Sequence, residues 1–454
     1  MNPWHLCAGL ALAAVAALAQ AAPAKVAGAD QIVSRTLPNG LELVVWPDRD
    51  IPNVAMYTWY RVGSRNERPG ITGLSHYFEH MMFNGTKTRP PGDFDRVMEA
   101  SGGSNNAYTS SDVTVYQNWF PASATELIFD LEADRMRNLD FDPKVVESER
   151  GVVYSERRSA IDNDNLGTLF EQLQATAYLA HPYQIPTIGW PSDIESWKIE
   201  DLQAYYEQYY APNNAVMFVV GAVDPDEVFR LADRYFAPLA AQPAPPPVTT
   251  REPPQLGERR FTVRRDAQTP IIAMAWHSSA AADAATRVME VLLSILGGGD
   301  SSRLHQRLIE REQAAVQVST YLDTQGFDPG LAVIYAIVPP GGDVAKTERL
   351  IDEEIARIAQ DGPSAAELAK ARNQALAGFW RGLETINGKA RALGVYEVFH
   401  GDYRKLFDAP AAYEGITAQE VQRAAAQVLR TGNRTVGILE PKPSEAAAGT
   451  GGAR

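Results

Sequence analysis

The sequence predicts a mixed fold of strands and helices in which one domain is duplicated, and three observations lead to this prediction. Segments with the alternation of strands and segments with helical periodicity follow one another along the chain. A helix, an asparagine turn and an apolar strand occur twice, at 201–219 and 420–438, at a constant offset of 219 residues (420 − 201). Between the copies, the proline-rich stretch 241–256 is typical of an extended linker.

The first half, 28–240, is predicted to begin with a hairpin. Asn39-Gly40 favours a tight turn before a strand at 41–47, and 53–60 predicts the next strand. Helices are predicted from Leu74 to the Asn84-Gly85-Thr86 stop and at 93–100, 125–137 and 143–158, with one strand at 107–119. A helix at 202–210, a buried strand at 215–220 and a helix ending at Tyr235 complete this half.

The second half, 257–442, repeats the strand segment 52–56 as 270–274 and predicts a helix at 285–296. This helix holds no histidine, so metal chemistry is expected in the first half only. The glycine-rich stretch 297–304 lacks the phosphate-binding pattern G-x-x-x-x-G-K-[ST], and we interpret it as a flexible or helix-terminating loop. The small, polar tail 443–454 predicts disorder.

Length and charge limit the classes of protein to which the chain can belong. Its 454 residues, 45% of them hydrophobic, suffice for two or more domains with cores. The net charge is −14, and no run of lysine or arginine stands out. This argues against a nucleic-acid partner and favours a basic or neutral substrate.

The N-terminus is typical of a secretory signal. The apolar run 6–19 precedes Ala19-Gln20-Ala21, a small-x-small cleavage site, so 1–21 is predicted to be a signal peptide and the mature chain periplasmic. A retained membrane anchor is the alternative, although the run is short for a span. The only cysteine is Cys7, so the mature chain would contain neither a disulfide nor a reactive thiol.

The segment His76-Tyr77-Phe78-Glu79-His80 carries the strongest chemical signal. On a helix, His76, Glu79 and His80 share one face. Two imidazoles four residues apart can bind one Zn²⁺ ion, and Glu79 can take a proton from water at the metal without binding it. The order H-x-x-E-H is the inverzincin signature. The alternative is a polar helix face that holds two histidines by chance.

A catalytic zinc site with two histidines needs a third protein ligand. The helix predicted at 143–158 carries Glu149 and Glu156 two turns apart on one face. Spacing alone leaves Glu156, Glu149 and Glu132 as candidates.

These segments together resemble the M16 family of zinc peptidases, the pitrilysin, insulysin and mitochondrial processing peptidase group, and its short two-domain bacterial branch in particular. The shared motifs are L-P-N-G-L, G-L-S-H-Y-F-E-H-M-M-F-N-G-T, S-N-N-A-Y-T, E-R-G-V-V-Y-S-E-R and G-G-G-D-S-S-R-L. The resemblance implies an α+β fold of the LuxS/MPP-like metallohydrolase type, in which two homologous domains enclose a substrate chamber.

The same resemblance implies the metal ligands and the activity. His76, His80 and Glu156 would bind one Zn²⁺ per chain, Glu79 would be the catalytic glutamate, and Glu149 would support the site. The implied activity is zinc-dependent hydrolysis of peptides or small unfolded proteins. The alternatives are a structural subunit of the same fold and a non-catalytic peptide-binding receptor or chaperone.

A further motif is implied to bind the substrate. The segment Asn106, Ala107, Tyr108 and Thr109 matches the family's exposed strand edge, to which an extended peptide adds as another strand.

One departure from the family pattern predicts a partner chain. Self-sufficient members carry an arginine and a tyrosine, seven residues apart, that hold the substrate and its developing oxyanion. Here the corresponding residues are Ile309 and Val316, which cannot donate hydrogen bonds from their side chains. Because some members divide the work between two chains, we predict a heterodimer in which a homologous partner supplies the Arg/Tyr pair. The alternatives are another register and other donors.

Overall fold

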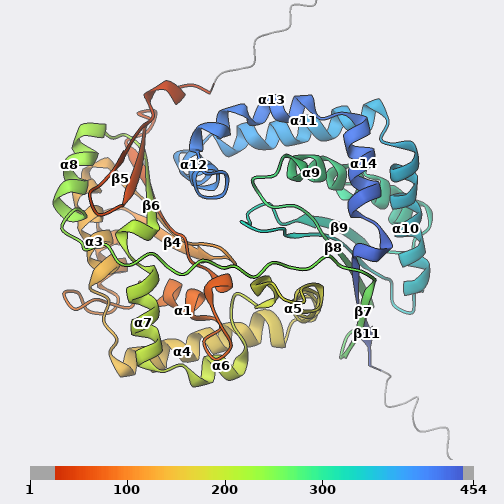
Figure 1. Cartoon of the computed structure of the whole chain (residues 1–454), viewed down its shortest axis with the longest axis horizontal. Coiled ribbons are helices and arrows are strands. Elements are labelled where there is room, and N and C mark those ends of the chain that lie inside the picture. Colours follow the sequence, from red (N-terminus) through yellow and green to blue (C-terminus); the bar gives the residue numbers. More distant parts are fainter. Residues whose placement is uncertain (1–25, 443–454) are drawn as a thin grey trace, which may run out of the picture.

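A computed structural model describes residues 26–442, and Figure 1 shows two sheets at opposite ends of the molecule with helices around and between them. The predicted signal peptide and the polar tail lie outside the described residues. Among residues 26–442, none of the helices combines the length and apolarity that crossing a membrane requires.

The first sheet has six strands in the order β1-β2-β6-β3-β5-β4. Their bounds are β1 Val33–Thr36, β2 Glu42–Pro47, β3 Asn53–Tyr60, β4 Ser104–Thr109, β5 Thr114–Pro121 and β6 Ala215–Gly221. The pair β2 and β6 is parallel and the other pairs are antiparallel. The predicted turn at Asn39-Gly40 joins β1 to β2, and Gly40 has a φ of 88° that favours glycine. Strand β4 lies at an edge of this sheet.

The single strand predicted at 107–119 is wrong, because this segment contributes to two antiparallel strands, β4 and β5. The chain turns at 110–113, where the Ser110 hydroxyl accepts hydrogen bonds from the backbone N–H groups of Asp112 and Val113. Alternation continues on both sides of the turn, so periodicity alone did not reveal it.

Helices cover one face of the first sheet. They are α1 Leu74–Met81, α2 Asp93–Ala100, α3 Thr125–Arg137, α4 Pro143–Arg157, α6 Pro191–Ser196, α7 Ile199–Tyr209 and α8 Pro225–Tyr235. Their apolar faces meet the strands in one core that includes Phe78, Phe129 and Tyr206.

The second sheet repeats the arrangement of the first without β1. Its order is β7-β11-β8-β10-β9, and its only parallel pair, β7 and β11, corresponds to β2 and β6. The strands are β7 Arg259–Arg265, β8 Ile271–His277, β9 Gln317–Leu322, β10 Leu331–Ile337 and β11 Arg434–Pro441. The helices beside them are α9 Ala284–Gly297, α10 Val344–Asp361, α11 Ala365–Gly382, α13 Ala409–Gly415 and α14 Ala418–Val428.

Matched contacts at the repeated asparagines show the duplication in detail. The side-chain amide of Asn214 donates to the carbonyl of Tyr209 at 2.9 Å, and that of Asn433 donates to the carbonyl of Val428 at 3.0 Å. Each asparagine therefore follows the end of a helix and precedes one of two corresponding strands, β6 or β11.

The two halves exchange helices across their interface. Helix α5 (Asn165–Ala177) belongs to the first half, but its Leu169 and Leu173 pack against the second sheet. Helix α12 (Ile386–His400) belongs to the second half, but its Leu393 packs with Trp59 of the first sheet. Figure 1 shows α5 beside the second sheet and α12 beside the first. Each sheet is thus covered on one face by a helix from the other half.

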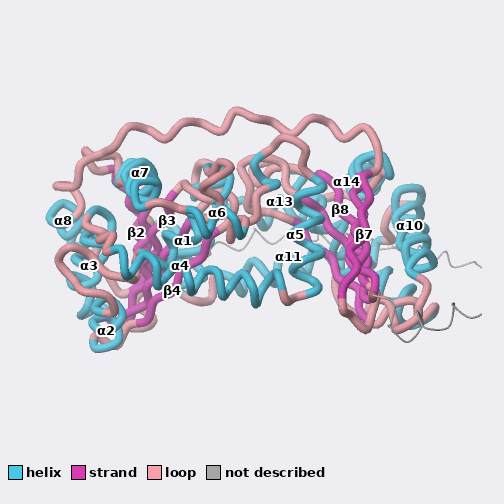
Figure 2. The backbone as a smooth tube through the Cα atoms, turned by 90° about the horizontal axis from the view of Figure 1, so that it is seen from below, coloured by secondary structure: helices cyan, strands magenta, loops and turns pink. Residues whose placement is uncertain are grey.

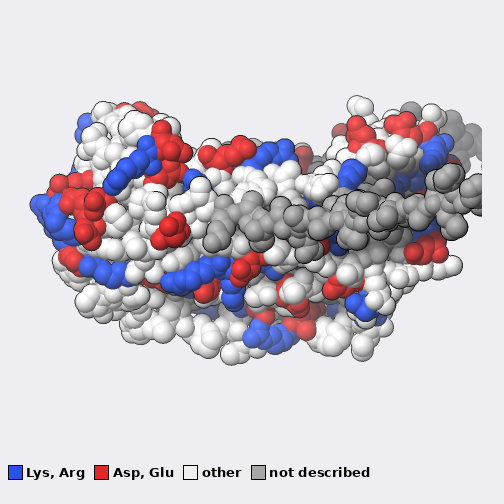
Figure 3. Space-filling model, turned by 90° about the horizontal axis from the view of Figure 1, so that it is seen from above, with Lys and Arg blue, Asp and Glu red and all other residues white. Residues whose placement is uncertain are grey.

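A buried charge network also joins the halves. The guanidinium group of Arg65 forms ion pairs with Asp112 of the first half and Asp328 of the second, each at 2.7 Å. Residues 240–258 contain no helix and no strand, and Figure 2 shows this segment crossing from one half to the other. Figure 3 shows basic and acidic side chains interspersed over one face of the molecule.

Candidate metal centre

Helix α1 presents its two faces to different surroundings. Leu74, Tyr77, Phe78 and Met81 are buried in the core of the first half. The helix begins after Gly73, and the carboxylate of Glu67 accepts hydrogen bonds from the N–H groups of Gly73 and Ser75, at 2.6 and 2.7 Å. Because the apolar face fixes the rotation of the helix, the opposite face directs His76, Glu79 and His80 away from the core.

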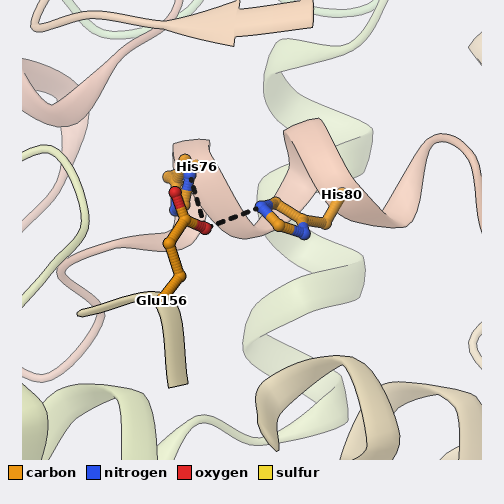
Figure 4. Close-up of side chains that lie close together, drawn as sticks. All are labelled: His76, His80 and Glu156. Carbon is orange, nitrogen blue, oxygen red and sulfur yellow. Dashed lines mark ion pairs between the residues drawn. The ribbon is translucent and has the colours of Figure 1, made fainter. Parts of the chain in front are cut away.

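The two histidines meet Glu156 of α4. The Oε2 atom of Glu156 lies 3.6 Å from Nε2 of His76 and 3.3 Å from Nε2 of His80. Figure 4 shows the carboxylate directed toward both rings. Within residues 26–442, no second group of three metal-binding side chains converges in this way.

The three side chains fit a zinc ion. Ligand atoms about 2.0–2.1 Å from a tetrahedral metal lie about 3.3–3.4 Å from one another, which is close to the two observed separations. Burial and the nearby His80 lower the pKa of His76 to about 4, so its imidazole is neutral at pH 7, as a metal ligand must be.

Glu149 supports one of the imidazoles. Its Oε1 lies 2.8 Å from Nδ1 of His80, and this hydrogen bond lowers the pKa of Glu149. The contact holds the His80 tautomer that carries a proton on Nδ1 and leaves Nε2 free to face Glu156.

Glu132, the remaining candidate from spacing, lies elsewhere. It is fully buried and accepts hydrogen bonds from Thr58 at 3.0 Å and from Asn118 at 2.7 Å, and it also pairs with Arg135. These contacts explain Glu132 as a core residue, and the structure does not bring it to the two histidines.

Glu79 is held beside the cluster by the edge strand. The hydroxyl of Thr109 donates to Oε2 of Glu79 at 2.6 Å, and burial raises the pKa of Glu79. Sequence reasoning missed this contact because 30 residues separate the two groups. It places the catalytic candidate at the end of β4.

The four residues predicted to bind substrate all lie in β4. Asn106, Ala107, Tyr108 and Thr109 pair with β5 on one side only, so the other edge of the strand is open for pairing. The ring of Tyr108 packs edge-on against Trp59, with ring centroids 6.2 Å apart.

The positions that match the family's Arg/Tyr pair lie in the second half. Ile309 packs partly buried against the core of that half, and Val316 is 57% exposed directly before β9. Neither side chain has a hydrogen-bond donor.

Comparison with known proteins decides the family. Residues 44–190 match the family model described as "Insulinase (Peptidase family M16)", and residues 196–375 match "Peptidase M16 inactive domain". This chain belongs to peptidase family M16. The expected α+β fold of two homologous halves is thereby confirmed, and only the half with the His-His-Glu cluster matches the insulinase model.

Relatives named as zinc proteases align over most of the M16 chain. It is 30% identical to zinc protease PqqE of Helicobacter pylori, over 90% of this chain and 92% of that protein. It is 31% identical to an uncharacterized zinc protease of Mycobacterium leprae, over 89% and 91% of the two chains. These names support a metallopeptidase.

Solved structures show the same M16 fold. A protease from Helicobacter pylori superimposes with a TM-score of 0.87 at 29% identity, covering 90% of this chain and 99% of that one. The periplasmic protease PqqL of Escherichia coli superimposes with a TM-score of 0.75 at 20% identity, covering 95% of this chain but 49% of that one.

Proposed function

We propose that this M16 chain is a zinc-dependent endopeptidase that hydrolyses peptides or small unfolded proteins. The observation that carries the proposal is the convergence of His76, His80 and Glu156, whose ligand atoms lie within 4.8 Å of one another, with the Glu156 carboxylate 3.6 and 3.3 Å from the two imidazoles. A further acid, Glu79, lies on the same helix face and is not needed to bind the ion. His76, His80 and Glu156 would hold one Zn²⁺, and Glu79 would serve as the proton carrier.

The residues around the cluster divide the catalytic work. A bound zinc ion supplies Lewis acidity, which lowers the pKa of water and polarises a carbonyl group. Glu79 takes a proton from the attacking water at Oε1 and returns it to the leaving amine. The Thr109 hydroxyl holds Oε2 and so fixes the direction of the carboxylate. Glu149 keeps His80 in one tautomer.

The edge strand would align the substrate. A peptide that adds to the open edge of β4 forms main-chain hydrogen bonds that do not depend on its sequence. Because Thr109 ends β4 and contacts Glu79, such a peptide passes the catalytic carboxylate in extended form.

We further propose that the active form is a heterodimer in the periplasm. The apolar Ile309 and Val316 leave the developing oxyanion without the family's two donors, so a homologous partner chain would supply the Arg/Tyr pair. The Escherichia coli relative, of which this chain covers 49%, is long enough to hold two such units in one chain. The same apolar pair favours the second candidate function, a peptide-binding subunit that does not turn over alone.

The test compares the mature chain alone with the chain purified together with a homologous partner that carries R-x₆-Y but no H-x-x-E-H. Zinc content and cleavage of a quenched fluorescent peptide are measured with and without chelator. We expect one zinc per chain and chelator-sensitive cleavage by the pair. Glu79→Gln should abolish cleavage, while Glu147→Gln, an exposed substitution on α4, should not. Cleavage by the Glu79→Gln pair at the parental rate would refute the mechanism.

A further inference from the structure

A pocket of about 540 Å³ opens where the end of β4 meets the second half. Its walls come from both halves and include Thr109, Leu173, Tyr178, Tyr321, Asp323 and Arg391. Thr109 also donates a hydrogen bond to Glu79, so the pocket begins beside the candidate catalytic carboxylate. A substrate extended along β4 would therefore reach it.

Asp323 is the acidic side chain of this pocket. It follows β9, where its backbone N–H donates to the carbonyl of Leu331 at 3.0 Å and fixes its position. Its Oδ1 accepts a hydrogen bond from the N–H of Gln325 at 3.2 Å. Within residues 26–442, no side-chain nitrogen of lysine, arginine or histidine lies within 4.0 Å of its carboxylate.

The nearby acids differ from Asp323 in this respect. Asp112 and Asp328 both pair with Arg65, and Asp328 also pairs with Arg251. A half-buried carboxylate without a cation is unusual, because burying a charge costs free energy that a paired opposite charge offsets. Burial accordingly raises the pKa of Asp323.

The rest of the pocket suits a long cationic side chain. Tyr178, Tyr183 and Tyr321 line it with Asp323, and aromatic rings attract ammonium and guanidinium groups. Phe170 and Leu173 of α5 provide apolar surface for the methylene groups of a lysine or arginine.

Arg391 of α12 also lines the pocket, near Tyr108 of β4. Among the described residues it has no carboxylate within 4.0 Å. It would repel a basic side chain from its own wall, which leaves the Asp323 end as the favourable position.

We propose that this pocket binds a lysine or arginine side chain of the substrate and that Asp323 determines this preference. The proposal rests on the proposed peptidase function, because strand addition to β4 is what brings a peptide to the pocket. Because Thr109 both lines this pocket and contacts Glu79, the basic residue of the substrate lies near the bond beside Glu79. The net charge of −14 attracts basic peptides as well.

The test measures binding without turnover. The Glu79→Gln chain with added Zn²⁺ is titrated into fluorescein-labelled peptides that carry one arginine, moved stepwise along a neutral scaffold. Each peptide has a twin with citrulline, which keeps the shape and removes the charge. At one position we expect arginine to bind roughly 10-fold to 100-fold more tightly than citrulline, as a charge-assisted hydrogen bond predicts.

Variants at the pocket assign this preference. Asp323→Asn should remove it, Asp323→Glu should retain it, and Arg391→Gln should retain or strengthen it. Asp300→Asn, whose side chain is 97% exposed on a loop, is the matched control and should leave it unchanged. Thermal unfolding checks that each variant is folded. Absence of any arginine preference, or a preference unaffected by Asp323→Asn, overturns the proposal.

Peptide cleavage by the chain with its partner distinguishes a failure of the peptidase proposal from a failure of the pocket proposal. Glu79-dependent cleavage that is indifferent to Asp323→Asn would leave the peptidase proposal standing and refute the pocket. An Asp323-dependent binding preference without any Glu79-dependent cleavage would support the pocket and refute the peptidase proposal.

Discussion

The contact between α12 and the first sheet yields a quantitative prediction at Gly394. A Cβ atom built on this glycine would lie 2.2, 2.4 and 2.5 Å from three atoms of the Trp59 indole. Trp59 is fully buried, so the ring cannot withdraw without disturbing the core. Alanine favours a helix by about 1 kcal/mol over glycine, whereas overpacking a core costs about 1–3 kcal/mol and occasionally more. Because these contacts are so short, the upper end of the overpacking cost applies. After subtraction of the gain in helix propensity, we expect Gly394→Ala to lower the free energy of unfolding by roughly 2 kcal/mol.

The control lies on the neighbouring helix α11. A Cβ atom on Gly378 would meet nothing within 4 Å, so Gly378→Ala should raise the free energy of unfolding by up to about 1 kcal/mol. Urea denaturation followed by tryptophan fluorescence measures both variants beside the parent chain. If Gly394→Ala proved as stable as Gly378→Ala, the close packing of α12 on the first sheet would be refuted.

Three further predictions concern the metal centre and two charge pairs. Glu149→Ala should weaken zinc affinity by roughly 10-fold to 100-fold, and Glu156→Ala should weaken it more. Competition with a chromophoric chelator measures both affinities. Equal affinities of the two variants would contradict the roles assigned to Glu149 and Glu156. The hydrogen bonds from Arg303 lower the pKa of Glu367 to about 2, below its ordinary value of 4.5, so the stability from this pair is present above that value and lost as pH falls toward 2. The stability difference between parent and Glu367→Gln should therefore shrink from pH 5 to pH 2, and a constant difference would be the contrary result. Arg65→Met leaves two buried carboxylates without this cation and should cost about 3–5 kcal/mol in urea unfolding, whereas a loss below about 1 kcal/mol would exclude the network as a support of the interface.

The periodicity of apolar residues predicted most of the helices and strands, because neighbouring residues in the sequence determine where these elements form. The helices at 93–100 and 125–137 have the predicted bounds, since one apolar face and a clear stop define each of them. The strand at 107–119 was wrong, because its alternation runs through the turn at 110–113 without a break.

The site was predictable in part for the same reason. One helical turn determines that His76 and His80 share a face, so spacing was sufficient for them. The third carboxylate comes from another helix, and only tertiary packing distinguishes Glu156 from Glu132, which the core holds. Asp323 carried no signal in the sequence, because its pocket exists only where the two halves meet.

The exchange of α5 and α12 makes each half incomplete without the other. Alone, either sheet would expose an apolar face to water, because the helix that covers this face belongs to the other half, beyond the proline-rich linker. The arrangement is similar to that of a domain-swapped dimer whose two subunits are joined in one chain. We therefore expect the half with the His-His-Glu cluster and the half without it to unfold together, as one cooperative unit.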